Sequence, residues 1–292
     1  GKYIAAGPLA SRWLQQQFAS DATLIRCGAQ VLGEPAAGYL SHPGYAALPK
    51  APYRYQEMLG VIWRENPSCY LEDGEQAVLM AALMETDNVG RPLIDAWIKR
   101  SGLSADAWLE KLFEATVIPF YHLLCRYGVA LIAHGQNVTL VMKNYVPQRI
   151  LLKDFQGDMR LVDEDFPQAQ SLPAQVKDVT ARLSADYIIH DLQTGNFVTV
   201  LRFISRLTLQ CGVSEIRFYQ VLAGVLRRYM AAHPELAERF AMFDLFKPQI
   251  IRVILNPVKL TFSEHDGGSR MLPNYVTDLD NPLFLASRES AQ

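Results

Sequence analysis

Two short polar clusters lie next to strongly apolar segments in the middle of the chain. The first is HGQN at residues 134–137, directly after the apolar run GVALIA, and the second is KDFQGD at residues 153–158, directly after RILL. Between them they offer an imidazole, amides, an ammonium group and carboxylates for chemistry. The candidate nucleotide-binding residues are His134, Gln136, Asn137, Lys153, Asp154 and Gln156.

These side chains suit a magnesium–nucleotide complex. Mg²⁺ takes oxygen ligands, of which one or two commonly come from the protein and the rest from phosphates and water. The side-chain oxygens of Asn137 and Asp154 match that need, as do the Asn and Asp that hold Mg²⁺ in kinases. Lys153 is a compact cation that neutralises phosphate charge. The plainer interpretation is a structural ion pair beside a histidine that bonds the backbone.

A hairpin must bring the two clusters together. Residues 138–142 and 149–155 read as strands, and the turn residues at 143–148 join them. Antiparallel pairing places Asn137 beside Lys153 and Asp154 at the open end. Alternation along a strand points Lys153 and Asp154 to opposite faces, unless the strand bends or ends there.

Helices and further strands surround this hairpin. Residues 104–128 predict a long helix with Ser104 as N-cap and Gly128 after its end. Residues 22–32 and 58–63 are short and apolar enough for strands, whereas 77–85 fits either type. Helical periodicity dominates beyond 172, at 174–190, 197–210, 214–232 and 235–246.

The sequence therefore predicts an α+β fold with a small, central, mostly antiparallel sheet and a large helical C-terminal part. We expect a mixed α/β region at 1–172, carrying both polar clusters, and a mainly helical region at 173–292 packed on it.

Composition excludes several classes of protein. The 28 Lys and Arg residues balance 30 Asp and Glu residues, so no basic surface for nucleic acid is expected. No apolar run approaches the roughly 20 residues that cross a bilayer. The four cysteines form no CxxC pair, which argues against zinc and favours reduced thiols in a cytoplasmic protein. The P-loop, Rossmann and nucleophile-elbow motifs are missing from the sequence.

HGQN followed by LLKDFQGDMRLV resembles the signature of the IucA/IucC family of NRPS-independent siderophore synthetases. The resemblance extends along the chain through YIAAGPLASRWLQQ, GEPAAGY, APYRYQEMLGVIWREN, LSADYIIHDLQTG, FKPQIIRVILNPVKL and GGSRMLPNY.

That resemblance implies a ligase that uses ATP and Mg²⁺. Such enzymes activate a citrate-derived carboxylate as an acyl-adenylate, and an amine then attacks it. The implied substrates are a citryl intermediate and N6-acetyl-N6-hydroxylysine, and a homodimer is expected. By position, His134, Gln136 and Asn137 would contact nucleotide and the carboxylate substrate. Asn137 and Asp154 would bind the metal.

Family members run to roughly twice this length, and the resemblance covers their C-terminal portion. It implies that further phosphate-gripping cations lie upstream in such proteins. Adenylation depends on positive charge at the triphosphate, so we expect this chain alone to show little ligase activity. ATP–pyrophosphate exchange on the 292-residue chain tests that expectation.

Four further residues are weaker candidates for binding an anionic substrate: Arg54, Glu57, Arg64 and Arg252. Arginine pairs well with carboxylates, but ordinary surface ion pairs are the favoured interpretation of the first three, and a buried structural pair explains Arg252 equally well. Glu34, in the loop GEP, is left without a role. Two other functions remain open: a kinase-like phosphotransferase, which needs a Gly-rich loop that residues 1–130 lack, and a non-catalytic helical interaction domain.

Overall fold

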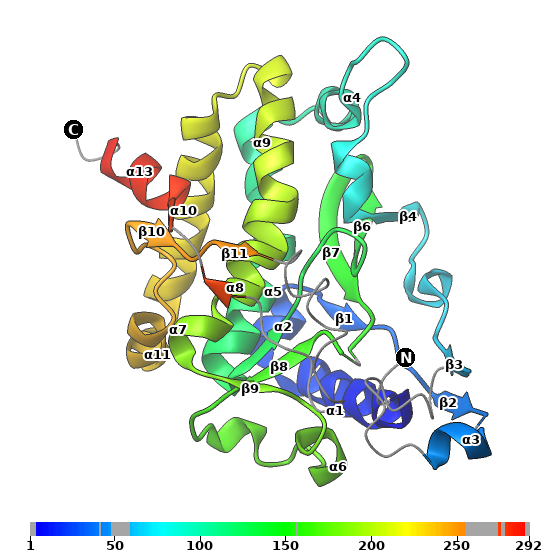
Figure 1. Cartoon of the computed structure of the whole chain (residues 1–292). Helices are drawn as coiled ribbons and strands as arrows, with labels where there is room; N and C mark the ends of the chain where they lie inside the picture. Colours follow the sequence, from blue (N-terminus) through cyan, green and yellow to red (C-terminus); the bar gives the residue numbers. More distant parts are fainter. Residues whose placement is uncertain are drawn as a thin grey trace.

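The predicted helix at 104–128 is the long central helix α5 (Ala105–Tyr127) of the computed structural model (Figure 1). The structure describes residues 4–40, 42–47, 59–155, 157–254, 274–275 and 278–289. Ser104 Oγ accepts a hydrogen bond from the Ala107 amide at 3.2 Å and caps the first turn. Gly128 ends the helix with φ +64°, and a Cβ there would lie 2.6 Å from Val162 Cγ1. Both predicted ends are confirmed.

The predicted hairpin is also confirmed, and it forms the middle of a four-stranded sheet. Its turn, however, is shorter than the expected 143–148, and its second strand runs from 146 to 152 in place of 149–155. Strands β6 (Val138–Lys143) and β7 (Val146–Leu152) pair antiparallel, with Val138 opposite Leu152. Asn144 and Tyr145 both have positive φ, at 51° and 65°, as a two-residue hairpin turn requires. The sheet has the order β1-β7-β6-β4. Strand β4 (Glu75–Leu79) is antiparallel to β6, and β1 (Gln30–Val31) runs parallel to β7.

A three-stranded sheet carries the segments on either side of this hairpin. Strand β5 (Val129–Leu131) pairs antiparallel with β8 (Met159–Val162), which is parallel to β9 (Arg182–Leu183). Short two-stranded pairs complete the set: β2 (Ala36–Tyr39) with β3 (Gly60–Trp63), β10 (Gln249–Ile250) with β13 (Leu279–Asp280), and β11 (Val253–Ile254) with β12 (Asn274–Tyr275). The α+β class with mostly antiparallel pairing is confirmed.

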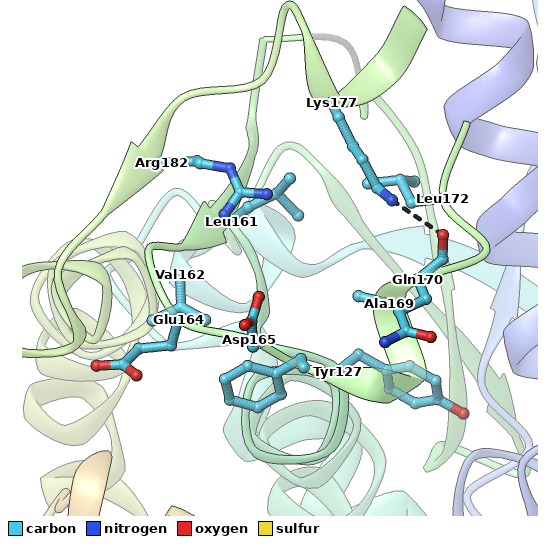
Figure 2. Close-up of a pocket in the computed structure, with 12 residues that line it drawn as sticks. Tyr127, Leu161, Val162, Glu164, Asp165, Ala169, Gln170, Leu172, Lys177 and Arg182 are labelled. Carbon is cyan, nitrogen blue, oxygen red and sulfur yellow. Dashed lines mark hydrogen bonds between the residues drawn. The ribbon is translucent and has the colours of Figure 1, made fainter. Parts of the chain in front are cut away.

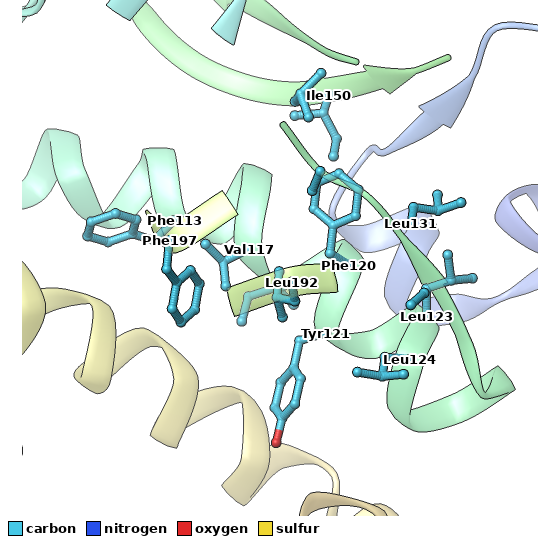
Figure 3. Close-up of a cluster of buried hydrophobic side chains, with 14 of the residues drawn as sticks. Phe113, Val117, Phe120, Tyr121, Leu123, Leu124, Leu131, Ile150, Leu192 and Phe197 are labelled. Carbon is cyan, nitrogen blue, oxygen red and sulfur yellow. The ribbon is translucent and has the colours of Figure 1, made fainter. Parts of the chain in front are cut away.

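One hydrophobic core joins the sheets to the helices (Figure 3). Helix α5 packs against β7 on one side and α10 (Glu215–Ala232) on another, and Phe113, Phe120 and Tyr121 are almost completely buried. Tyr121 also donates a hydrogen bond to the Phe243 carbonyl at 2.9 Å. Both sequence regions contribute to this core, and the boundary at residue 172 stays a prediction.

The structure differs from the expected secondary structure in several places. The segment 197–210 is part π-helix and part α9 (Arg202–Thr208), and the helix expected at 235–246 ends at Met242. Residues 174–190 form short helices and strand β9 in place of one helix, because Arg182 and Leu183 pair with β8 and interrupt the helical segment. Residues 22–32 begin as helix α2 (Ala22–Arg26), not as a strand, because the Asp21 carboxylate accepts the amides of Thr23 and Leu24. Only Gln30–Val31 of that segment is extended.

The remaining helices have these bounds: α1 Gly7–Ser20, α3 Pro43–Ala46, α4 Leu93–Ser101, α6 Ala174–Lys177, α7 Ala185–Ile188, α8 His190–Leu192, α9 Arg202–Thr208, α11 Ala237–Met242 and α13 Pro282–Glu289. The 3₁₀ turns are Ile4–Ala6, Pro67–Tyr70, Met80–Met84, Pro167–Ala169, Leu209–Cys211 and Pro234–Leu236, and Gln193–Leu201 is a π-helix. Over the described ranges, no helix combines the length and apolarity needed to cross a membrane.

Candidate active site

Strand ends from both sheets meet at one place and carry the polar clusters to it. Because Val138 pairs with Leu152, Asn137 and Lys153 occupy the open end of the hairpin. Strand β1 is parallel to β7, with Val31 opposite Leu152, so the loop after β1 reaches the same end. In the neighbouring sheet Leu131 pairs with Met159, and the Ile132 amide donates to the Asp158 carbonyl at 3.0 Å.

Strand β7 ends at Leu152, so the alternation of side chains along a strand does not force Lys153 and Asp154 to opposite faces. Asp154 has φ +64°, a left-handed conformation that turns the chain out of the sheet. Lys153 and Asp154 then meet: Nζ donates to Oδ2 at 2.9 Å. Asp adopts this conformation more readily than most residues, and non-glycine residues in sparsely populated conformations cluster at functional sites.

Asp154 also binds Arg64, which follows strand β3. Arg64 Nη2 donates to Asp154 Oδ1, and the same Nη2 lies 2.8 Å from Glu34 Oε1. Burial alone would raise the pKa of Asp154, but the hydrogen bond from Lys153 and the charge of Arg64 outweigh it and hold the pKa below its usual value. Burial raises the pKa of Glu34 despite its bond to Arg64.

Asn137 and His134 converge on a different carboxylate, Asp158. Asn137 is 7% exposed, and its Nδ2 donates to Asp158 Oδ2 at 2.7 Å. The backbone amide of Gln136 donates to His134 Nδ1 at 3.3 Å, so Nε2 is the ring nitrogen that carries a hydrogen. That Nε2 lies 3.8 Å from Asp158 Oδ2. Asp158 belongs to the KDFQGD motif, yet sequence reasoning gave it no role.

The HGQN turn is supported from behind by two close backbone approaches. The Ala81 amide donates to the Gly135 carbonyl at 3.0 Å, and a Cβ on Gly135 would lie 3.0 Å from that amide nitrogen. Asn196, which is completely buried in the π-helix, donates from Nδ2 to the Ala133 carbonyl at 3.0 Å. Sequence reasoning missed Asn196, because a lone Asn in a helical segment carries no motif.

A small pocket of about 210 Å³ opens where these groups meet. Its polar lining consists of Asn137, Lys153, Asp154 and Asp158, and its apolar lining includes Phe120 and Leu152. The structure thus brings together three of the residues that the sequence placed near nucleotide or metal, Asn137, Lys153 and Asp154, with His134 beside them. Gln136 is exposed at the edge of the turn.

The oxygen-rich donor set fits Mg²⁺ carried by a nucleotide better than a resident metal. The carboxylates of Asp154 and Asp158 are partly exposed. Asn137 donates a hydrogen bond from Nδ2 to Asp158, so the side-chain oxygen of Asn137 is the atom suited to a metal. Within the part of the chain that the structure describes, no three His, Cys, Asp or Glu side chains gather to hold an ion. Phosphate oxygens and water would complete the octahedral shell.

Among the described residues, one further candidate does not line this pocket. Arg252 is exposed just before β11 and does not line it. Arg54, Glu57 and Gln156 lie outside the described residues. Glu34 received no role from the sequence. It contacts the same arginine nitrogen as Asp154, Arg64 Nη2. The sequence feature that could have indicated it is its position shortly after the apolar strand β1.

A larger hollow of about 420 Å³ lies elsewhere, between β8, β9 and residues 164–172 (Figure 2). Lys177 there donates to the Gln170 carbonyl at 2.9 Å, and Arg182 lies 3.8 Å from Asp163. Of the sequence-predicted site residues that the structure describes, none lines this hollow. The chemistry of the donor groups, not the size of the space, identifies the smaller pocket as the candidate site.

Two family models match the chain. One is described as the IucA / IucC family and matches residues 1–85. The other is described as ferric iron reductase FhuF-like transporter and matches residues 106–269, more than half of the chain.

Known proteins match almost the whole chain. It is 70% identical to an aerobactin synthase from Escherichia coli over 99% of its own length and 50% of that protein. The structure of aerobactin synthetase IucC from a hypervirulent pathotype of Klebsiella pneumoniae matches at 65% identity with a TM-score of 0.86, over 98% of this chain and 49% of that one. ATP-bound aerobactin synthetase IucA from the same source shares the fold at 17% identity, with a TM-score of 0.70, over 97% of this chain and 48% of that one. The chain thus spans about half the length of the relatives it matches.

Proposed function

The chain belongs to the IucA/IucC family and contains a FhuF-like segment at residues 106–269, and from this membership we propose that it acts in ATP-dependent siderophore synthesis. Its proposed role is to provide the nucleotide- and metal-binding wall of a ligase. The observation that carries the proposal is the convergence of Asn137, Lys153, Asp154 and Asp158 on one pocket at the ends of four strands.

The proposed reaction has two steps. An oxygen of a citrate-derived carboxylate attacks the α-phosphorus of ATP, and pyrophosphate leaves. The amine of N6-acetyl-N6-hydroxylysine then attacks the activated carbonyl, an amide bond forms, and AMP leaves with the bonding electron pair. The identity to aerobactin synthases supports aerobactin as the product.

The residues of this chain have distinct proposed tasks in that reaction. Lys153 places a positive charge beside the phosphates, where negative charge shifts toward pyrophosphate. Asn137 and Asp154 would hold Mg²⁺ through oxygen atoms, with Asp158 orienting the Asn137 amide. Bound Mg²⁺ would neutralise phosphate charge. His134 would donate a hydrogen bond from Nε2 to a carboxylate substrate, and the support for this role is that Nε2 lies 3.8 Å from Asp158 Oδ2, which lines the pocket.

Product analysis tests this proposal against a phosphotransferase. The chain is incubated with Mg·ATP, a citryl substrate and N6-acetyl-N6-hydroxylysine, alone and as part of an E. coli aerobactin synthase in which it replaces the matching half. We expect AMP and pyrophosphate, released in proportion to hydroxamate product, from the complete enzyme. Release of ADP, or nucleotide turnover independent of the amine, would contradict a ligase.

Two further expectations follow from the same proposal. Use of ATP as a co-substrate places the reaction in the cytoplasm. A homodimer is proposed as the assembly, and light scattering after gel filtration measures it directly.

A further inference from the structure

Arg64 bridges two carboxylates that differ sharply in exposure. Its Nη2 contacts both Glu34 Oε1 and Asp154 Oδ1, and its Nε lies 3.3 Å from the same Glu34 oxygen. The Glu34 side chain is 0% exposed, whereas that of Asp154 is 40% exposed. Arg64 therefore has one partner fixed inside the protein and one partner at the pocket that solvent and ligands reach.

The loop that carries Glu34 is fixed on both sides. The Glu34 amide donates to Ser11 Oγ at 3.0 Å. The Gly33 amide donates to the Glu65 carboxylate at 2.6 Å, and the Glu65 amide donates back to the Gly33 carbonyl at 2.9 Å. Arg64 and Glu65 are consecutive, so the same two residues that follow β3 clamp the loop and present the guanidinium.

Glu34 is also incompletely satisfied where it lies. Its second oxygen, Oε2, is buried and makes no hydrogen bond of normal geometry among the described residues, although the Asp154 backbone lowers the pKa of Glu34. An unpaired buried carboxylate oxygen is costly and calls for a functional explanation. Holding an arginine at a ligand-binding surface is such an explanation, because the anchor must be a charge that the ligand cannot reach.

Asp154 is paired with two cations, Arg64 and Lys153. This inference rests on the proposed function, in which Asp154 binds Mg²⁺. At least one of the two cations must then leave Asp154 when the ligand binds. We propose that Glu34 is a positioning residue that retains Arg64, so that Arg64 exchanges Asp154 for an anionic oxygen of the ligand. That oxygen belongs either to a nucleotide phosphate or to the substrate carboxylate.

A binding cycle in the 292-residue chain tests the exchange. Calorimetric titrations with Mg·ATP and, separately, with citrate are made on the unaltered chain, Glu34→Gln, Arg64→Met and the double variant. We expect Glu34→Gln to weaken binding about tenfold, because Arg64 then turns wholly toward Asp154. In the Arg64→Met background the same substitution should change binding less than twofold. Glu34→Asp, which keeps the charge, should restore most of the affinity.

The ion pair between Arg149 and Glu75 supplies the matched control. The Glu75 side chain is 3% exposed, close to the 0% of Glu34. Arg149 also donates to the Tyr70 carbonyl. Neither Glu75 nor Arg149 lines the pocket. Glu75→Gln should lower the melting temperature and leave both affinities unchanged. A merely structural Glu34 would behave in the same way.

The outcomes separate the two proposals. An effect of Glu34→Gln on Mg·ATP alone assigns Arg64 to phosphate, and an effect on citrate alone assigns it to the carboxylate. Unchanged binding of both ligands, or an effect that persists in the Arg64→Met background, overturns the exchange while leaving the proposed function intact. Failure of the unaltered chain to bind either ligand contradicts both.

Discussion

Asn137 donates its Nδ2 hydrogen to Asp158 Oδ2 at 2.7 Å, across 21 residues of sequence. This bond joins the hairpin sheet to the β5–β8 sheet, because Asn137 precedes β6 and Asp158 precedes β8. It also fixes the orientation of the amide, so that the oxygen of Asn137 is the atom available to a metal. The position of Asp158 thus decides what Asn137 can do.

We expect Asp158→Ala to weaken Mg·ATP binding about tenfold and to reduce the free energy of unfolding. Its removal leaves the Asn137 amide, 7% exposed, without its acceptor, which costs about 1–3 kcal/mol. Urea denaturation and calorimetry measure the two effects. Asp158→Asn retains an acceptor oxygen and should recover most of the stability. Equal stability of the alanine variant and the unaltered chain would show that this bond is dispensable.

Gly135→Ala should displace the HGQN turn. A Cβ at this position would lie 3.0 Å from the Ala81 nitrogen and 3.1 Å from its Cα, both backbone atoms that cannot move aside cheaply. Overpacking of this kind costs about 1–3 kcal/mol, and ligand affinity should fall with it. Gly90→Ala, at a glycine with nothing within 4 Å of the added Cβ but a positive φ, controls for the general effect of replacing glycine. Tight binding by Gly135→Ala would mean that the turn tolerates the shift.

Asn196→Leu should loosen the same turn from the opposite side. The substitution removes the donor to the Ala133 carbonyl, next to His134, and leaves that acceptor buried. The expected loss is about 1–3 kcal/mol of unfolding free energy, together with faster amide exchange at residues 134–137. Hydrogen exchange followed by mass spectrometry provides the measurement, and unchanged protection of this peptide is the contrary result.

Acid should destabilise the protein through Asp21. Its carboxylate accepts the Thr23 and Leu24 amides, the Tyr127 hydroxyl and His122 Nε2. Burial alone would raise the pKa of Asp21, but the bond and charge of His122 and the Leu24 amide outweigh it, so the folded-state pKa lies well below the usual value. A depressed folded pKa adds stability above the unfolded-state pKa of about 3.9, and that stability is lost as pH falls below it.

The Asp21→Asn variant makes this contribution measurable. At pH 7 it should lose about 1.5–3 kcal/mol, because Asn caps a helix as well as Asp does but loses the charge of the carboxylate that His122 and Tyr127 contact. The difference from the unaltered chain should shrink as pH drops below about 4. Urea titrations at several pH values give both curves, and a gap that stays constant with pH would assign the effect to packing alone.

Much of this architecture is predictable from local patterns. The helix from Ser104 to Gly128 and the hairpin around Asn144 carry their own caps and turn residues, so their bounds are encoded nearby. Helix α2 was mistaken for a strand because one carboxylate, Asp21, outweighs the β-propensity of the residues after it.

The sequence predicts only some of the residues at the candidate site, and the reason differs from that for the helices and strands. Asn137 and Asp154 belong to motifs beside apolar strands, whereas Glu34, Asp158 and Asn196 act through pairings that only the folded sheets create. The parallel alignment of β1 with β7 brings Glu34 within reach of the arginine that Asp154 binds. No spacing along the chain indicates that alignment.

The central claim is that Asp154 belongs to a Mg·ATP site, and one titration tests it most directly. Asn accepts the left-handed conformation of residue 154, so Asp154→Asn removes the charge and preserves the turn. Asp163→Asn, at an exposed carboxylate paired with Arg182, is the matched control. We predict that the unaltered chain and Asp163→Asn bind Mg·ATP alike and that Asp154→Asn binds at least tenfold more weakly. Equal affinity of Asp154→Asn and the unaltered chain would contradict the account.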